Sequence, residues 1–273
     1  NIQGVLAGRI DRLESDTKRI LQEASVIGKT FLYDILQRIS LVKHDINRHL
    51  LQLERLDFIR AKSIQPNLEY IFKHTLTQEV VYNGLLRADR KEIHERIGSA
   101  IETLFHHRRQ DFYGILAHHF KHGRSQVKAV EYLIKAGKKS FAMCALEEAQ
   151  QYYGAAYKIL AEQFENGERE KFLLVELLNE WGISIIWRGA TEELIALLMK
   201  HLEDVKQVDD NEKLSMFFSS LGMAFQTTLK LTDSFTYLQK SLDLAEKAKS
   251  TKAIGYASLR FSLVCMNLGR LDE

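Results

Sequence analysis

Proline is almost absent from this sequence, and its absence constrains the fold more than any other feature. Pro66 is the only proline among 273 residues. A proline inside a helix removes a hydrogen bond and clashes with the preceding turn, so nearly the whole chain is free to be helical. The apolar content of 45% and charged content of 27% are those of an ordinary globular protein. We therefore expect a mainly α-helical protein, long enough for about two domains.

The first part of the chain combines helical periodicity with one β-hairpin. Apolar residues recur at helical spacing in three successive segments, and two short β-prone runs follow, joined by Gln65-Pro66-Asn67, which predicts a turn. The predicted elements are helices over 20–27, 31–39 and 43–56, strands over 58–63 and 68–72, and further helices over 76–86 and 88–105. Three helices followed by a hairpin indicate a winged-helix domain, and Gly28 is expected to end its first helix.

The segment 70–82 places His74 between the second strand and the next helix. Thr75 and Gln78 have the spacing of a capping box, which favours helix initiation. A helix N-terminus carries a partial positive charge and unpaired N–H groups, so this position suits an anion such as a phosphate. The alternative interpretation is a histidine that only caps or packs against its own helix.

This segment resembles the histidine motif in the winged-helix part of STAND-type signalling ATPases, in a looser bacterial form, Phe-x-His-x-Leu, with Lys73 and Thr75 flanking His74. Residues 2–13 and 24–28 resemble the junction between the ATPase lid and the winged helix. The similarity runs from residue 2 to about residue 160 and is greatest to bacterial proteins in which a class III adenylate/guanylate cyclase precedes the ATPase and helical repeats follow. The positions that fall where the pattern expects them are His74, Glu79, Tyr82, Leu85 and His94.

The resemblance implies that His74, helped by Lys73, contacts ADP bound in an ATPase module outside this chain. ADP or ATP with Mg²⁺ is therefore expected for the longer protein, and no cofactor for this part of it. Gly28-Lys29-Thr30 matches the end of a phosphate-binding loop, but the earlier glycine of that loop would fall at Glu23, inside a predicted helix. We expect a chain without catalytic activity of its own.

Beyond residue 107 the pattern is helical throughout. The segments 122–136 and 144–156 resemble tetratricopeptide repeats in their small-x-x-aromatic spacing, and similar turns recur near Arg188, Leu229 and Leu268, at intervals of roughly 40 residues. Each helical pair has a face that it cannot bury alone, so successive pairs should stack into a right-handed superhelix. Its concave groove is expected to bind a protein or peptide.

The predicted organisation has three parts. Residues 1–12 are expected to be the end of the ATPase lid or a linker, 13–106 the winged helix with its helical extension, and 107–273 the repeats, cut within one of them. We expect a piece of a longer bacterial signalling protein whose partners include the ATPase and cyclase domains of the same chain. With two distant cysteines, no signal peptide and no apolar run long enough to span a bilayer, a cytoplasmic location is expected.

Two other functions are considered. A DNA-binding regulator with a repeat-type sensor would read DNA with the helix 43–56, but its cations are interrupted by acidic residues, and residues 1–109 carry 18 basic against 14 acidic residues. The residues concerned are Lys43, Arg48 and Arg55 against Asp45, Glu54 and Asp57. A peptide-binding scaffold without nucleotide dependence is the other alternative.

Metal and catalytic chemistry are weakly supported. His118 and His122 share a helical face at i, i+4, which suits zinc, but no His-Glu-x-x-His pattern accompanies them. We expect these histidines to pack the first repeat helix and no metal to bind. The side chains of His94 and Glu95 are adjacent on a regular helix and point in different directions, so they are not expected to act as an acid–base pair. Cys144 is expected to be a buried structural thiol, as is Cys265. In the repeats, one apolar stripe is predicted to belong to the core, whereas Trp187 is assigned to neither the core nor the surface. The stripe consists of Leu173, Leu177, Leu178 and Trp181.

Overall fold

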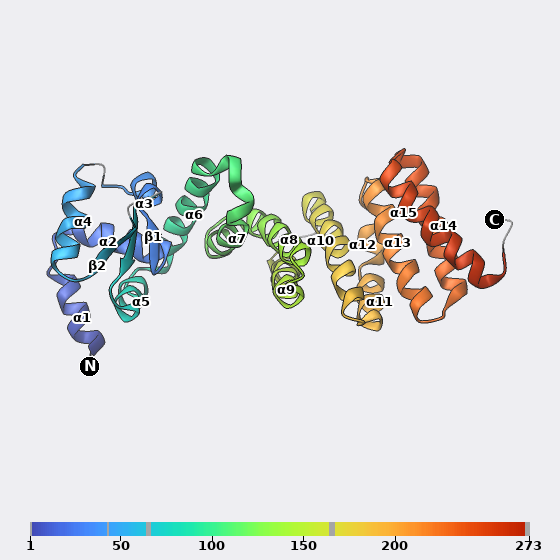
Figure 1. Ribbon diagram of the computed structural model, residues 1–273, viewed down its shortest axis with the longest axis horizontal. Helices are drawn as coiled ribbons and strands as arrows, with labels where there is room; N and C mark the ends of the chain where they lie inside the picture. Colours follow the sequence, from blue (N-terminus) through green and yellow to red (C-terminus); the bar gives the residue numbers. More distant parts are fainter. Residues whose placement is uncertain (1, 43, 64–66, 164–166, 271–273) are drawn as a thin grey trace. The chain divides into compact units, whose positions relative to one another are not determined.

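The computed structural model describes residues 2–42, 44–63, 67–163 and 167–270. The chain divides into two compact units, Asn1–Ala129 and Val130–Glu273, and the division falls within helix α8 (Gln126–Ala142). Helices dominate both units, and among the described residues a sheet occurs in the first unit alone (Figure 1). This is the mainly α-helical fold that the sequence predicts.

The first unit is a small antiparallel sheet packed among helices. Its elements before α8 are α1 (Ile2–Asp11), α2 (Ser15–Ile27), β1 (Thr30–Leu32), α3 (Tyr33–Ile39), α4 (Ile46–Arg55), β2 (Ile59–Ser63), β3 (Glu69–Phe72), α5 (Thr75–Asn83), α6 (Arg87–Leu104), the 3-10 helix η1 (His106–Phe112) and α7 (Tyr113–His122). From α2 to β3 the order is therefore helix, strand, helix, helix, strand, strand.

The sheet has the order β1-β3-β2, with Phe31 opposite Tyr70 and Ile59 opposite Phe72. The predicted hairpin is confirmed, although Gln65 and Pro66 of its turn lie outside the described residues. The prediction that Phe31 belongs to a helix is wrong, because Phe31 lies in β1. A strand of three residues exists only through pairing with a distant partner, and local periodicity carries no trace of that pairing.

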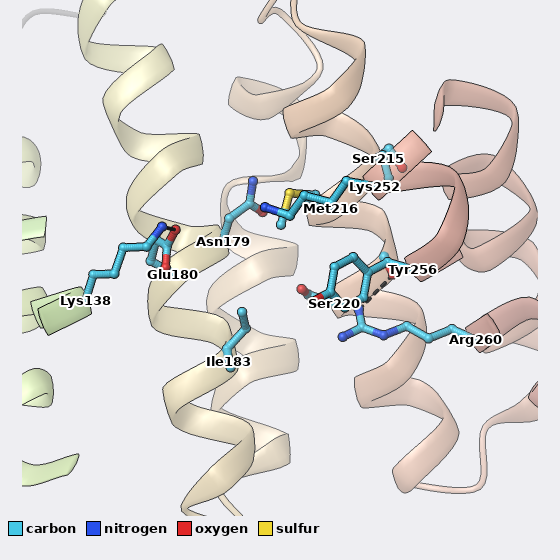
Figure 2. Close-up of a pocket in the computed structure, with 12 residues that line it drawn as sticks. Lys138, Asn179, Glu180, Ile183, Ser215, Met216, Ser220, Lys252, Tyr256 and Arg260 are labelled. Carbon is cyan, nitrogen blue, oxygen red and sulfur yellow. Dashed lines mark hydrogen bonds and ion pairs between the residues drawn. The ribbon is translucent and has the colours of Figure 1, made fainter. Parts of the chain in front are cut away.

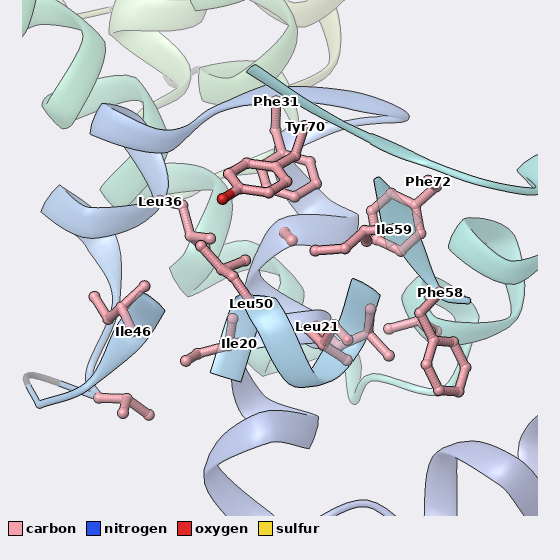
Figure 3. Close-up of a cluster of buried hydrophobic side chains, with 14 of the residues drawn as sticks. Ile20, Leu21, Phe31, Leu36, Ile46, Leu50, Phe58, Ile59, Tyr70 and Phe72 are labelled. Carbon is pink, nitrogen blue, oxygen red and sulfur yellow. The ribbon is translucent and has the colours of Figure 1, made fainter. Parts of the chain in front are cut away.

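The core of this unit lies between the sheet and helices α2, α3 and α4 (Figure 3). Phe31 stacks on Tyr70 with 5.7 Å between ring centroids, and Phe72, Leu21 and Leu50 are almost completely buried. Burying each such side chain stabilises the fold by roughly 1.5–3 kcal/mol before entropy is counted. The three predicted helices thus supply one wall of a single core.

Gly28 ends helix α2, as predicted. Its backbone N–H donates to the carbonyl oxygen of Ala24 at 3.2 Å, and its φ of 147° is open to glycine but strained for other residues. β1 begins two residues later, so Gly28-Lys29-Thr30 leads from a helix into a strand. A phosphate-binding loop leads from a strand into a helix, so the order here is the reverse.

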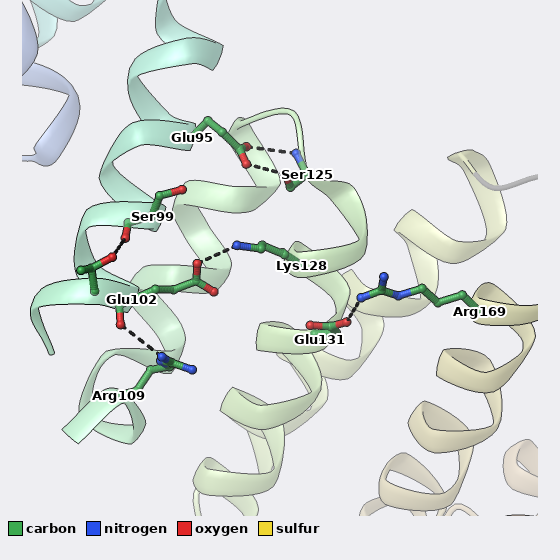
Figure 4. A network of polar contacts seen from close by, with 9 residues as sticks. Glu95, Ser99, Glu102, Arg109, Ser125, Lys128, Glu131 and Arg169 are labelled. Carbon is green, nitrogen blue, oxygen red and sulfur yellow. Dashed lines mark hydrogen bonds and ion pairs between the residues drawn. The ribbon is translucent and has the colours of Figure 1, made fainter. Parts of the chain in front are cut away.

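Helix α6 is tied to its neighbours by acidic side chains. Glu23 of α2, which is 1% exposed, accepts a hydrogen bond from Arg96 at 2.6 Å. Glu95 accepts hydrogen bonds from the hydroxyl of Ser125 and, at 3.0 Å, from its backbone N–H, just before α8 begins (Figure 4). A carboxylate there complements the N-terminus of α8, so Glu95 has a structural role, away from His94.

The second unit consists of helical hairpins in tetratricopeptide-like repeats. Beyond α8 its elements are α9 (Leu146–Gln163), α10 (Glu168–Trp187), α11 (Thr191–Lys200), α12 (Leu202–Val205), α13 (Asn211–Thr227), α14 (Leu231–Ala248) and α15 (Thr251–Leu268). In the predicted core stripe, Leu173, Leu177 and Leu178 are buried as expected, whereas Trp181 is half-buried. Trp187 is 70% exposed and belongs to the surface.

The turns of these repeats share one backbone geometry. Cys144, Gly189, Leu229 and Gly269 all have left-handed φ values between 60° and 73°. In each turn the following N–H donates to a carbonyl five residues earlier, as in Lys230 N–H to Phe225 O at 3.0 Å, which is the Schellman arrangement. The last three positions are 40 residues apart, which agrees with the predicted interval. The prediction that Cys144 is buried is wrong, because this turn exposes it; Cys265 is buried as expected.

Glycines allow the two helices of a hairpin to approach closely. A Cβ at Gly222 of α13 would lie 2.5 Å from Cγ of Leu238 on α14, and one at Gly137 of α8 would lie 2.6 Å from the ring of Tyr153 on α9. Real carbon atoms do not approach that closely, so the large side chain occupies space that only glycine leaves free. Each pair therefore fixes the level at which the two helices meet.

Candidate functional site

His74 lies at the junction that the sequence predicts. β3 ends at Phe72, His74 is the N-cap residue of α5, and its backbone is extended at φ −129° and ψ 132°. Its carbonyl oxygen accepts a hydrogen bond from the N–H of Thr77 at 3.0 Å. The imidazole is exposed, and among the described residues no hydrogen bond to it is found. The ring is thus available to a group from outside this chain.

The predicted capping box is absent. No side chain caps the N-terminus of α5, and Gln78 instead donates to the carbonyl oxygen of Ser25 at 2.7 Å. That hydrogen bond joins α5 to α2, 53 residues earlier in the chain, a contact that the local spacing of Thr75 and Gln78 does not reveal. The N–H groups of the first turn of α5 therefore have no side-chain acceptor from the helix itself.

Lys73 is engaged by a neighbour. Its ammonium lies 2.7 Å from a carboxylate oxygen of Asp57, and its backbone N–H donates to the carbonyl oxygen of Phe58 at 3.0 Å. The hydrogen bond and charge of Lys73 hold the pKa of Asp57 below its usual range. Both side chains are exposed, so this ion pair can open at little free-energy cost. Of the two predicted site residues, His74 is the one already free to bind.

The helix α4 does not gather cations on one face for DNA. Arg48 lies 3.6 Å from Glu14, and Glu54 accepts a hydrogen bond from the N–H of Ala61. Arg55 is exposed near the end of the helix, and Lys43 lies outside the described residues. Exposed cations paired with acids give little of the phosphate affinity that DNA binding requires.

A cluster of histidines joins α5, α6 and α7. Nδ1 of His94 lies 2.9 Å from Nδ1 of His119, and Nε2 of His94 lies 3.1 Å from the hydroxyl of Tyr82. The rings of His118 and His122 lie 5.7 Å and 5.3 Å from that of His94, between centroids. The sequence pairs His118 with His122 but gives no sign that His94 meets His119, because the contact spans 25 residues.

The two central histidines are neutral at ordinary pH. Burial, together with the neighbouring histidines and Arg90, lowers the pKa of His94 to about 3. Burial and the histidines around it lower the pKa of His119 to about 2. Both rings are at most 2% exposed. Each therefore contributes to the fold as an uncharged hydrogen-bonding group.

Metal-holding geometry is not found in this cluster. Across residues 2–270, apart from the three gaps given above, no three histidine, cysteine, aspartate or glutamate side chains are arranged to hold a metal ion. Both nitrogens of His94 have partners, and Nδ1 of His122 donates to the carbonyl oxygen of His118 at 2.8 Å. The i, i+4 histidine pair thus packs and caps its own helix.

The repeats contain a cavity of about 310 Å³ between α10, α13 and α15, with Lys138 of α8 on one side (Figure 2). Polar side chains line it together with the apolar surfaces of Ile183, Met216 and Tyr256. Lys138 and Glu180 form an ion pair at 2.6 Å on one side. Sequence spacing does not reveal this site, because its residues come from four helices spread over more than 100 positions of the sequence.

Comparison with known proteins places the chain among helical repeat proteins by fold. No family model matches the sequence. An uncharacterized protein of Rhizobium meliloti (strain 1021) is 25% identical over 193 residues, which are 70% of this chain and 19% of that protein. Among solved structures, the apo form of RapI is similar with a TM-score of 0.50 and 15% identity, over 86% of this chain and 58% of RapI.

A further similar structure is a Signal Transduction ATPase with Numerous Domains (STAND) protein with a tetratricopeptide repeat sensor from Pyrococcus horikoshii. It has a TM-score of 0.44 and 12% identity, over 98% of this chain and 50% of that protein. The chain thus spans about a fifth of the bacterial relative and about half of each solved structure. In the described part of the chain, no helix is both long enough and apolar enough to span a bilayer.

Proposed function

We propose that this chain is the regulatory and partner-binding region of a STAND-type signalling ATPase, in which His74 contacts the β-phosphate of bound ADP. The observation that carries the proposal is the exposed imidazole of His74 at the junction of β3 and α5, without a hydrogen bond to the described residues. The helical repeats, whose fold is tetratricopeptide-like, support a role in protein interaction. The nucleotide would be held by an ATPase module of the same protein.

The chemistry at this junction suits a phosphate. The first turn of α5 has N–H groups without intrahelical acceptors and the positive end of the helix dipole. His74 adds an imidazole N–H that can donate to a phosphate oxygen. Lys73 is held by Asp57 at 2.7 Å, so it would join the contact only when that exposed pair opens.

A nucleotide contact of this kind would make the protein a switch. ADP bound against His74 would favour the closed, inactive state, and a protein or peptide bound to the repeats would favour the open state. Such a ligand acts only if it binds one state more tightly than the other. The region itself would work without catalysis, and the resemblance to cyclase-linked bacterial proteins points to a class III cyclase as the effector, in the bacterial cytoplasm.

The test is ADP affinity, measured by titration calorimetry on the longer protein that includes the ATPase module. His74→Ala should weaken ADP binding by about 1–3 kcal/mol, the range for a hydrogen bond to a charged group. His107→Ala is the matched control, because His107 is also exposed but lies in η1, away from α5. Equal ADP affinity for the wild type and His74→Ala would refute the nucleotide contact.

A further inference from the structure

The cavity in the second unit contains a guanidinium without a counter-charge. Arg260 of α15 is half-buried, and its Nη1 donates to the hydroxyl of Ser219 at 2.7 Å. The ring of Tyr256 lies 5.9 Å away. Among the described residues no carboxylate lies within ion-pair distance of Arg260. An arginine has five N–H donors in a fork that matches a carboxylate, so most of its binding capacity is unused.

A second cation lies on the same helix. Lys252 is exposed in the first turn of α15 and has no ion pair or hydrogen bond within the described part of the chain. Figure 2 shows Lys252 and Arg260 extending from α15 into the cavity, with Tyr256 between them along the helix. Residues four apart on a helix lie on one face, so these three side chains form one binding edge.

Most of the acidic residues nearby already have a partner. Glu180, the acidic residue of the cavity lining, is paired with Lys138 at 2.6 Å. In the adjoining cavity Glu176 lies 3.5 Å from Lys213, and Asp210 accepts a hydrogen bond from the N–H of Lys213. The adjoining cavity also has Glu212 in its lining, and Lys252 borders both cavities. In the lining of the main cavity itself, Lys252 and Arg260 have no ion pair with the described residues and exceed the one carboxylate, Glu180, which is held by Lys138; this excess favours an anionic ligand.

A buried amide indicates that the ligand has N–H groups as well. Asn179 is 7% exposed, and its Nδ2 donates to the carbonyl oxygen of Lys213 at 3.0 Å. Its Oδ1 is buried without a hydrogen-bond partner in the described residues. Buried acceptors are nearly always paired in folded proteins. A backbone N–H of a bound segment would complete this one.

We infer that this cavity binds a short acidic segment of a partner protein. Arg260 and Lys252 hold a carboxylate of the segment, Oδ1 of Asn179 accepts one of its backbone N–H groups, and Ile183, Met216 and Tyr256 contact its apolar side chains. The volume of about 310 Å³ is at the lower end of ligand sites, so it accommodates a few residues. The inference rests on the proposed role of the repeats in protein interaction.

The probe is an acetylated, amidated five-residue peptide of alternating leucine and glutamate, compared with the same peptide carrying glutamine. Binding is followed by the ¹³C-methyl signals of the five methionines, with that of Met216 assigned by its loss in Met216→Leu. The glutamate peptide should shift the Met216 signal saturably and bind about tenfold more tightly than the glutamine peptide, as expected for a charged hydrogen bond.

Variants of the two cations complete the test. Lys252→Gln and Arg260→Gln should each weaken the glutamate peptide about tenfold, whereas Lys247→Gln, an exposed position outside the cavity, should leave its affinity unchanged. Lys252 is exposed, so its variant remains informative if Arg260→Gln fails to fold. Equal affinity for both peptides, an equal shift with inorganic phosphate, or no shift with either peptide would overturn the inference. None of these outcomes bears on the nucleotide test of His74.

Discussion

The buried histidines make the stability of the first unit depend on pH. His94 and His119 have pKa values of about 3 and about 2 because of burial and neighbouring histidines, against about 6.5 in an unfolded chain. Below about pH 6.5 the histidines of the unfolded chain bind protons that the folded chain does not bind, which favours the unfolded state. Their contribution to stability is fully present above about pH 6.5 and is lost progressively as the pH falls toward the folded-state pKa values.

The size of the effect follows from the linkage relation. Between about pH 7 and pH 5, each histidine that stays neutral in the fold loses about 2 kcal/mol of stability, and the two together about 4 kcal/mol. Carboxylates also titrate at the low end of this range, so the decisive quantity is the difference between variants. His119→Asn keeps a hydrogen-bonding group near Nδ1 of His94 but does not titrate. The stability that this variant loses between pH 7 and pH 5 should therefore be smaller than the wild-type loss by about 2 kcal/mol.

The assay is urea unfolding of the whole chain at the two pH values. Circular dichroism follows both units, whereas tryptophan fluorescence follows the second unit alone, because Trp181 and Trp187 are the only tryptophans. The loss of stability caused by the two buried histidines should be detected by circular dichroism. His107→Asn, at an exposed position, should lose as much stability as the wild type between the two pH values. If His119→Asn loses as much stability as the wild type between pH 7 and pH 5, the buried neutral pair is not the cause.

Two further predictions concern the repeats, and both are measured by urea unfolding with tryptophan fluorescence. Gly222→Ala should destabilise the second unit by about 1–3 kcal/mol through overpacking against Leu238. Gly255→Ala, whose Cβ would meet nothing within 4 Å beyond its own stretch of helix, should stabilise the unit by about 0.5–1 kcal/mol. Equal stability of the two variants would contradict the close approach at Gly222. Leu229→Gly should stabilise it by up to about 1 kcal/mol, because Leu229 is left-handed and 81% exposed; a loss of stability would contradict the strain.

Features with a local cause were predictable from the sequence. The helices follow from apolar periodicity, the end of α2 from Gly28, and the place of His74 from the change of period between β3 and α5. The 40-residue interval of the repeats is also visible in the sequence. Each of these depends on residues within one or two turns of each other, where spacing determines structure.

Features with a distant cause were not predictable. β1 depends on pairing with β3, Gln78 bonds to Ser25 rather than capping α5, and His94 meets His119 across 25 residues. Exposure of Cys144 follows from a left-handed turn that the helical pattern around it conceals. The cavity near Arg260 is lined by four helices, so its charged groups come together only in the folded repeats.

The recurring turn geometry has a consequence for how such a chain changes length. Gly189, Leu229 and Gly269 adopt the same left-handed conformation although one of them is a leucine, so the position in the period matters more than the residue type. Gain or loss of a whole 40-residue repeat would leave every turn at an equivalent position. An insertion of a few residues within a helix would instead rotate the apolar face of the rest of that helix away from its partner. We therefore expect natural variants of this array to differ by complete repeats, and short insertions to be confined to the turns.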